Sequence, residues 1–501
     1  MKKLLFILLL VSASAFAQDA TVTKYADLIT PADLKENLSI IASDALEGRY
    51  TGSRGQKMAA AYIANHFESV GLTLPANGSY YMPVELSSTQ VTDAFIKAGT
   101  TKYAAVNELV YMGQSATNGE ISLEAIFVGK GSDADLAYLN VKDKAAIIYV
   151  DQLSFDAFRS IRKLSTTLHD KGAQMILAVA GGKPEDFTPF ATMMKGFTRG
   201  SLSLNKPNAS PMGKGMFLLS QEVASKILNT PFAKLEKAVK DPAAKKPLAK
   251  IKPSRMVYSV SVESKIIKSE NMVGFLEGTD KKDEVIVLSA HFDHIGIQHE
   301  GEDKINNGAD DDGSGTVTIL QLAKAFAQAK KDGHGPRRSI LFMTVTGEEE
   351  GLLGSQYYVE HPIYPLTSTV ANLNIDMVGR RDPEHAGKPD YVYVIGSDKL
   401  SSELHEINER NNKTYTQLSF DYTYNDENHP SNLYKRSDHW NFAKNNVPII
   451  FYFDGIHEDY HKPSDEVSKI DFDLLAKRGK IVFYTAWELA NRDNRITVDK
   501  K

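Results

Sequence analysis

Histidine and carboxylate residues follow several apolar segments in the second half of the chain, and such residues could bind divalent metal ions. They are His291 and Asp293, the aspartates 310–312, the glutamates 348–350, Asp376 and His461. Imidazole and carboxylate together suit zinc and other first-row divalent metals. The chain has no cysteine, so any such site must be built from His, Asp and Glu. It also has no thiol nucleophile, and no disulfide is possible.

The segments that carry these residues alternate between apolar strands and helical patterns. Strands are expected at 285–290, 339–345, 370–378, 391–396 and 447–453, and helices at 315–330, 355–361, 401–411, 438–444 and 471–492. Such alternation predicts an α/β domain with a mostly parallel mixed sheet flanked by helices. Open sheets of this kind bind ligands beyond the carboxyl ends of their strands. We therefore expect the candidate residues to meet at that edge.

These histidine and carboxylate residues are sufficient to bind two metal ions. Each ion needs one imidazole and one further carboxylate, and a carboxylate and a water molecule can be shared between them. An additional carboxylate must stay off the metals to take a proton from that water. Alone, an aspartate before a helix is usually an N-cap, and a run of glutamates is usually a solvated helix start. Five such positions in one predicted sheet make coincidence improbable.

Six motifs follow one another between residues 271 and 492: SAHFDH, NGADDDGSG, GEEEGLLGS, NIDM, YKRSDH and YHKPSD. With them the chain resembles the co-catalytic dizinc aminopeptidase family, whose members include bacterial leucyl aminopeptidase and whose relatives include glutamate carboxypeptidase and glutaminyl cyclase. The resemblance implies the zinc-peptidase fold and two zinc ions, for which cobalt or manganese could substitute. It implies metal ligands at His291, Asp311, Glu349, Asp376 and His461.

The resemblance also implies roles for residues around the metals. Glu348 matches the general base, and Asp293 matches a carboxylate that orients the first histidine ligand. Tyr434 matches a tyrosine that can stabilise an oxyanion. Asp310 remains the alternative to Asp311 as the bridging ligand, whereas Asp312 would follow a strained peptide bond that can be cis.

Other residues near the motifs receive lesser roles. Glu350 has no role in the family pattern, Asp465 is expected to be structural, and His294 is expected to be a wall residue. The segment 457–461, HEDYH, spells the zinc-binding motif HExxH, but that motif needs a helix. The segment lies between Gly455 and Pro463, so a helix is not expected there.

The first 17 residues have the pattern of a secretory signal peptide. Lys2 and Lys3 precede an apolar run, and Ala15-Phe16-Ala17 provides a cleavage site before Gln18. We expect an exported protein, either periplasmic or secreted, with no membrane span. The net charge is −5, and no long basic run is present, so nucleic acid is not an expected partner.

The rest of the N-terminal half divides into two parts. Residues 18–114 are expected to begin the peptidase domain, with helices at 31–46 and 56–72 and a loop between them whose Arg49 and Arg54 are expected to be solvated. Residues 115–255 resemble a protease-associated insertion, a smaller β-rich α/β domain. The catalytic domain is expected to resume at 256–501.

Together these features predict a zinc-dependent exopeptidase that removes N-terminal residues from peptides with a free N-terminus. A carboxypeptidase or dipeptidase would need basic residues to hold the substrate carboxylate, and Arg380 and Arg381 keep that alternative open. Glutaminyl cyclisation is less expected because the ligands for both ions are present. A non-catalytic binding protein is disfavoured for the same reason.

Overall fold

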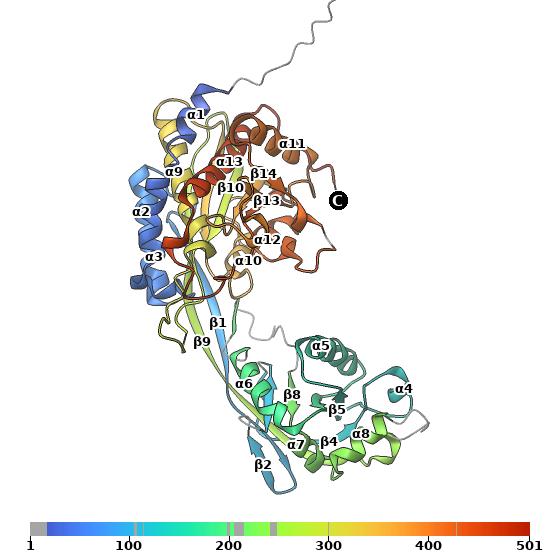
Figure 1. Cartoon of the computed structure of the whole chain (residues 1–501). Coiled ribbons are helices and arrows are strands. Elements are labelled where there is room, and N and C mark those ends of the chain that lie inside the picture. Colours follow the sequence, from blue (N-terminus) through green and yellow to red (C-terminus); the bar gives the residue numbers. More distant parts are fainter. Residues whose placement is uncertain are drawn as a thin grey trace, which may run out of the picture. The chain divides into compact units, whose positions relative to one another are not determined.

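A computed structural model of the chain describes residues 18–104, 108–113, 115–197, 201–204, 215–240, 248–298, 300–426 and 428–500. The predicted signal peptide, residues 1–17, lies outside the described residues. The chain forms two compact units (Figure 1). The first comprises the chain up to Glu85 together with Lys268–Lys501, and the second comprises Leu86–Ile267. All of the candidate metal ligands belong to the first unit.

The first unit is built on a mixed sheet. Its strands lie in the order β14 (Ser419–Asp421), β13 (Tyr391–Ile395), β15 (Ile449–Phe453), β12 (Thr369–Ile375), β10 (Lys281–His291), β11 (Arg338–Val345) and the C-terminal part of β9 (Ser254–Leu276). The pairs β10–β11, β10–β12, β12–β15 and β13–β14 are parallel, and β13–β15 and β9–β11 are antiparallel. The predicted mostly parallel mixed sheet is confirmed.

Helices cover both faces of this sheet. Successive side chains of a strand point to opposite faces, and the buried strands carry apolar residues on both. Along β10, Ile286, Leu288 and Ala290 join the core beneath one set of helices, whereas Val285 and Val287 join the core on the other face. The first set is α1 (Ala20–Ala26), α2 (Pro31–Ile41), α3 (Arg54–Val70), α9 (Gly315–Lys331) and α13 (Phe472–Asn491), with α11 (Ser402–Asn411) beside α13. The other face is covered by α10 (Leu353–Glu360) and α12 (His439–Ala443).

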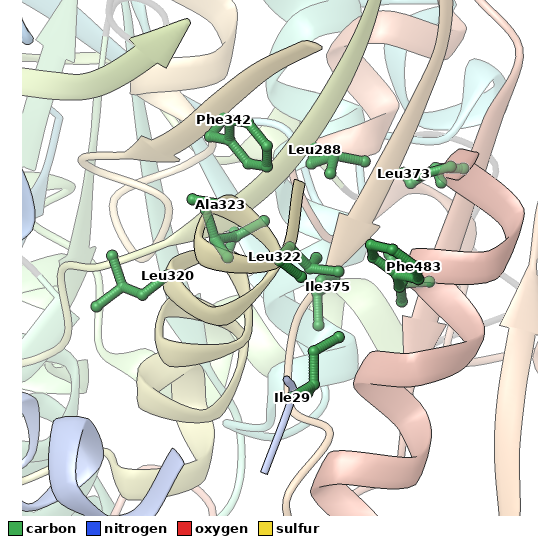
Figure 2. Close-up of a cluster of buried hydrophobic side chains, with 14 of the residues drawn as sticks. Ile29, Leu288, Leu320, Leu322, Ala323, Phe342, Leu373, Ile375 and Phe483 are labelled. Atoms are coloured by element: carbon green, nitrogen blue, oxygen red, sulfur yellow. The ribbon is translucent and has the colours of Figure 1, made fainter. Parts of the chain in front are cut away.

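The larger of these cores packs α9 and α13 against the central strands. Figure 2 shows Leu322 of α9 and Phe483 of α13 on either side of Ile375 of β12, and Leu320 and Ile29 belong to the same core. Helix α9 is buried along most of its length because α2 and α3 pack on it as well. A helix held on several sides presents its N-terminal loop to the sheet edge in a fixed position. That loop carries Asp310, Asp311 and Asp312.

Local sequence signals explain where the leader helices begin and end. The Thr30 hydroxyl accepts a hydrogen bond from Asp33 N and caps α2, and Ser53 caps α3 in the same way. Helix α3 ends at Gly71, whose φ of 88° is left-handed. The helix expected to reach 46 ends at Ile41, and a 3-10 segment, η1 (Asp44–Arg49), follows it.

The second unit is a smaller α/β unit. Its sheet runs β9, β4 (Ile121–Phe127), β5 (Ala145–Val150), β6 (Met175–Ala180), β8 (Met216–Leu219) and β3 (Leu109–Met112). The hairpin strands β1 (Tyr81–Ala98), β2 (Thr101–Ala104) and β7 (Ser201–Leu204) pair beside it. Its helices are α4 (Asp133–Leu136), α5 (Phe155–Asp170), α6 (Phe187–Phe197), α7 (Gln221–Ile227) and α8 (Phe232–Lys240).

The limits of the second unit, 86–267, lie outside those predicted for the insertion, 115–255. The difference arises because the chain passes from one unit to the other inside two long strands, β1 and β9. A continuous strand shows no break in its hydrophobic pattern, so the sequence has no boundary signal there. Among the described residues, no helix combines the length and the apolar composition needed to cross a membrane.

Candidate metal centre

The predicted ligands lie just past the carboxyl ends of four neighbouring strands. His291 is the last residue of β10, Asp376 directly follows β12, and Glu349 lies in the turn between β11 and α10. Asp311 belongs to η4 (Ala309–Ser314), a short segment that leads into α9, and His461 lies in the loop after β15. Since β10, β11, β12 and β15 form parallel pairs, their carboxyl ends share one edge of the sheet. All five side chains meet there.

The carboxylate of Asp311 lies between two imidazoles. Its Oδ1 is 3.2 Å from His291 Nε2, and its Oδ2 is 3.0 Å from His461 Nε2. His291 Nε2 is also 3.6 Å from Asp376 Oδ1, and His461 Nε2 is 3.0 Å from Glu349 Oε2. Each imidazole therefore has one carboxylate of its own and shares Asp311 with the other.

These contacts fit metal ligands better than hydrogen bonds. His291 Nε2, His461 Nε2 and Asp311 Oδ2 are buried, and none has a hydrogen-bond partner among the described residues. Buried polar atoms are normally satisfied, so an ion is the simplest partner for them. Two ligands of one tetrahedral zinc, each about 2.1 Å from the ion, lie about 3.4 Å apart. The four distances above, from 3.0 to 3.6 Å, bracket that value.

Asp310 and Asp312, which flank Asp311, are engaged with the protein. Asp312 accepts hydrogen bonds from the backbone N–H groups of His291, Gly315 and Met377 at 2.9 to 3.1 Å. Asp310 accepts one from Gly379 N at 2.7 Å. Although Asp312 also lies near His291 and Asp376, its oxygens tie the ends of β10, α9 and β12 together. The bond between Asp311 and Asp312 is cis. This geometry favours Asp311 as the shared carboxylate.

His294 lies closer to the centre than a simple wall residue would. It is fully buried, and its Nδ1 is 2.7 Å from Glu349 Oε1, the oxygen that does not face His461. His294 also lies near Asp311, but its Nδ1 is 3.9 Å from the nearer oxygen of that carboxylate. An imidazole in this place holds a ligand carboxylate in position. We interpret His294 as the orienting partner of Glu349.

Asp293 acts differently from the prediction. The backbone carbonyl of Asp293 is 3.1 Å from His291 Nδ1, whereas its carboxylate Oδ1 is 3.9 Å away. The carboxylate instead accepts hydrogen bonds from Glu348 N at 3.2 Å and from the Thr51 hydroxyl at 2.8 Å. Burial raises the pKa of Asp293 to about 6. The side chain thus fixes the turn that carries Glu348.

Glu348 has the position of a general base. Its Oε2 lies 4.0 Å from His291 Nε2, and its side chain lines the pocket above the ligands. Burial and the neighbouring carboxylates of Asp376 and Glu349 raise its pKa well above the usual range. A carboxylate with a raised pKa that stands beside the ligands can accept and return a proton. Glu350, in contrast, accepts a hydrogen bond from the Tyr50 hydroxyl at 2.9 Å.

A pocket lies beside the candidate metal ligands. Its lining residues are Asp311, Glu348, Asp376, Met377, Leu433, Arg436, Phe451, Phe453, Ile456 and Tyr460. Tyr434 is absent from this lining, and its ring packs against Trp440, with the centroids 5.6 Å apart. Burial and the nearby carboxylates raise the pKa of Tyr460, whose ring stacks on His461 at 3.9 Å. Sequence reasoning missed Tyr460, although it directly precedes a predicted ligand.

Arg49 was expected to be solvated, and that expectation is wrong. Its guanidinium is fully buried and donates hydrogen bonds to four backbone carbonyl groups at 2.7 to 3.0 Å: those of Ile41, Phe292, Asn307 and Gly308. The Ile41 carbonyl is at the end of α2, whereas the other three belong to the loop after His291 and the loop before Asp310. Arg49 thereby joins the two segments that deliver His291 and Asp311. Arg54, as expected, is exposed, and it pairs with Glu47.

The segment 457–461 is not a helix in the structure, as expected, so the zinc-binding helical motif is not formed. His457 Nε2 instead lies 3.2 Å from Asp310 Oδ2. Asp465 accepts hydrogen bonds from the backbone N–H groups of Asp310 and Asp311 at 3.0 to 3.2 Å. Both residues therefore support the loop that carries the shared carboxylate. The predicted structural role of Asp465 agrees with these contacts.

Comparison with known proteins identifies a family that this domain resembles. Residues 271–486 match the model of peptidase family M28, and the resemblance seen in the motifs is confirmed. A probable leucine aminopeptidase of Arthroderma benhamiae is 31% identical over 218 residues, which cover 42% of this chain and 55% of the relative. A probable zinc metalloprotease of Pyrenophora tritici-repentis is 25% identical over 287 residues, 49% of this chain and 56% of the relative. The chain spans about half the length of these relatives.

Solved structures agree on the fold. An aminopeptidase from Aneurinibacillus sp. strain AM-1 has a TM-score of 0.58 at 18% identity, with 96% of this chain and 98% of that chain covered. The zinc aminopeptidase BSAP of Bacillus subtilis has a TM-score of 0.54 at 18% identity, with 94% of this chain and 99% of that chain covered. At this identity the likeness establishes the α/β fold alone.

Proposed function

We propose that this protein is a zinc-dependent aminopeptidase that hydrolyses N-terminal residues from peptides with a free N-terminus. The observation that carries the proposal is the position of Asp311, whose two carboxylate oxygens each face a different imidazole. His291 with Asp376, and His461 with Glu349, would complete the sites of two ions. The match to peptidase family M28 supports the same reaction class.

The residues around the metals have separate tasks in this proposal. Bound zinc would supply Lewis acidity, which polarises the scissile carbonyl and lowers the pKa of the attacking water. Glu348 takes the proton from that water and passes it to the leaving amine. Tyr460, which lines the pocket, donates a hydrogen bond from its hydroxyl to the oxyanion. The corresponding prediction for Tyr434 stays a prediction.

Replacing Glu348 with Gln tests the mechanism because the amide cannot accept a proton as a carboxylate does. We expect Glu348→Gln to retain two metal ions per chain, measured by mass spectrometry of the metal content, and to lose at least about 100-fold in kcat, the scale of general-base catalysis. Glu350→Gln is the matched control, because Glu350 faces Tyr50. Full activity of Glu348→Gln would overturn the assignment.

A substrate panel tests the reaction class. The proposal requires hydrolysis of unblocked aminoacyl anilides and no hydrolysis of their N-acetylated forms. Hydrolysis of the N-blocked substrates alone would favour a carboxypeptidase. The two arginines that kept this alternative open are engaged elsewhere: Arg380 lies 3.1 Å from Asp459, and Arg381 pairs with Asp390. Glutaminyl cyclisation would be seen as pyroglutamate formation from an N-terminal glutamine.

Two further parts of the proposal concern the rest of the chain. The signal-peptide pattern of residues 1–17 supports export to the periplasm or the medium. The unit 86–267, a smaller α/β unit between two parts of the peptidase domain, supports the proposal of a protease-associated insertion. N-terminal sequencing of the protein recovered after export would locate the cleavage site, which is expected before Gln18.

A further inference from the structure

The pocket beside the metal ligands contains one unexplained charge. Apart from the metal-site carboxylates and Tyr460, its wall is mainly apolar, formed by Met377, Leu433, Phe451, Phe453 and Ile456. Among the described residues that line the pocket, Arg436 alone is positively charged. The proposed mechanism gives this residue no task.

The guanidinium of Arg436 is available for a ligand. The residue is exposed, and its side chain makes no hydrogen bond or ion pair with any residue in the described part of the chain. An exposed arginine needs no partner, so exposure alone would mean little. Arg436, however, lines the same pocket as Tyr460 and the metal-site carboxylates, so its charge faces the space in which a ligand would bind. The neighbouring Lys435 instead lies over the Trp440 ring at 5.3 Å.

We propose that Arg436 binds a carboxylate of the substrate and makes the enzyme favour peptides with a negative charge near the scissile bond. This inference rests on the proposed aminopeptidase function. A guanidinium fork matches a carboxylate in a bidentate, charge-assisted pair. The carboxylate could be the side chain of an N-terminal Glu or Asp, or the C-terminus of a dipeptide.

The metal-site carboxylates do not exclude an anionic substrate. The site contains four carboxylates, those of Asp311, Glu348, Glu349 and Asp376. Two divalent ions would offset their four negative charges, so the loaded centre would be close to neutral. The unpaired Arg436 would then set the sign of the potential in the pocket. A neutral apolar pocket would accept leucine-like residues, whereas this pocket adds one site for an anion.

Selectivity ratios test the inference. The first ratio compares kcat/KM for glutamyl and leucyl p-nitroanilide, and the second compares leucyl-glycine with leucyl-glycinamide. Because a charge-assisted hydrogen bond is worth about 1.5–3 kcal/mol, we expect Arg436→Ala to lower one ratio by about 10- to 100-fold. A fall in the first ratio identifies an acidic N-terminal side chain as the group bound, and a fall in the second identifies the C-terminal carboxylate. Lys435→Ala, which removes the neighbouring charge, should retain both wild-type ratios.

A binding measurement separates this inference from the proposed function. Calorimetry would measure the affinity of Glu348→Gln for glutamic acid α-amide and leucyl-glycine, with and without Arg436→Ala. We expect the second substitution to weaken one of these ligands at least 10-fold and to leave leucinamide unchanged. If neither affinity nor either ratio changes, Arg436 does not bind the carboxylate. If the wild type cleaves no unblocked substrate, the proposed function fails while the binding result stands by itself.

Discussion

Replacing Arg49 with Met should destabilise the first unit, which comprises the chain up to Glu85 and Lys268–Lys501, more than any conservative surface change. The substitution keeps most of the apolar stem but removes the donors of four buried hydrogen bonds. A buried carbonyl that loses its donor costs about 1–3 kcal/mol. Four such carbonyls together should lower the free energy of unfolding by at least about 4 kcal/mol. A typical domain has a free energy of unfolding of only about 5–15 kcal/mol.

The change should also weaken metal binding. Burial lowers the pKa of Arg49 to about 10, with the carboxylates of Asp293 and Asp311 acting against that fall, so the side chain remains charged at neutral pH. Without it, the loops before Asp310 and after His291 lose their common anchor. We expect weaker zinc binding, measured by competition with a chelating dye, together with the loss in stability.

Urea unfolding followed by tryptophan fluorescence would measure the stability loss. The two tryptophans, Trp440 and Trp487, both belong to the first unit, so their signal reports that unit. Arg54→Met is the matched control, since Arg54 is an exposed arginine of the same loop region and its ion pair is worth at most about 1 kcal/mol. If Arg49→Met unfolds within about 1 kcal/mol of the wild type and binds zinc equally well, the anchoring role of Arg49 is wrong.

Two further predictions concern the same unit. A methyl group at Gly55 would lie 1.8 Å from the Leu46 carbonyl oxygen, so Gly55→Ala should cost at least about 2 kcal/mol in the same urea assay, and a neutral result would contradict the packing. Burial lowers the pKa of His439 to about 3, whereas in the unfolded chain this imidazole has its ordinary pKa of about 6.5. Below that pH the unfolded chain therefore binds a proton at His439 more readily than the folded chain does. Stability should therefore fall as the pH drops from about 6.5 towards 3, and His439→Asn should flatten that dependence. An unchanged pH profile would show that His439 does not cause it.

The strands, and the meeting of the candidate ligands at one sheet edge, were predictable from the sequence because their signals are local. A run of apolar residues that ends in His or Asp marks both a buried strand and its carboxyl end, as in β10 with His291 and β12 with Asp376. Parallel pairing then brings those ends to one edge. The order of the motifs also indicated the resemblance to a family and the different roles expected for Glu348 and Glu349. The spacing could not show which carboxylate oxygen faces which imidazole.

The supporting residues could not be predicted because their partners lie far away in the sequence. Arg49 bonds to carbonyl groups 243 to 259 residues away, and its own surroundings have the composition of an exposed loop. Arg436 and Tyr460 also enter the pocket from short loops, whose course is set by packing rather than by periodicity. The sequence pointed to Arg380 and Arg381 as candidate carboxylate-binding residues because they follow Asp376, yet both pair with other carboxylates.

The three consecutive aspartates show why residue type alone could not settle the site. Asp310 turns towards Gly379 and His457, Asp312 towards the backbone of β10 and α9, and only Asp311 has its oxygens directed at two imidazoles. Their side chains are chemically identical, so the backbone of η4 decides which one faces both imidazoles. The carboxylate of Asp465 holds that backbone in place, because it accepts hydrogen bonds from the N–H groups of Asp310 and Asp311. The carboxylate that faces both imidazoles is therefore specified by contacts outside the motif as much as by the motif itself.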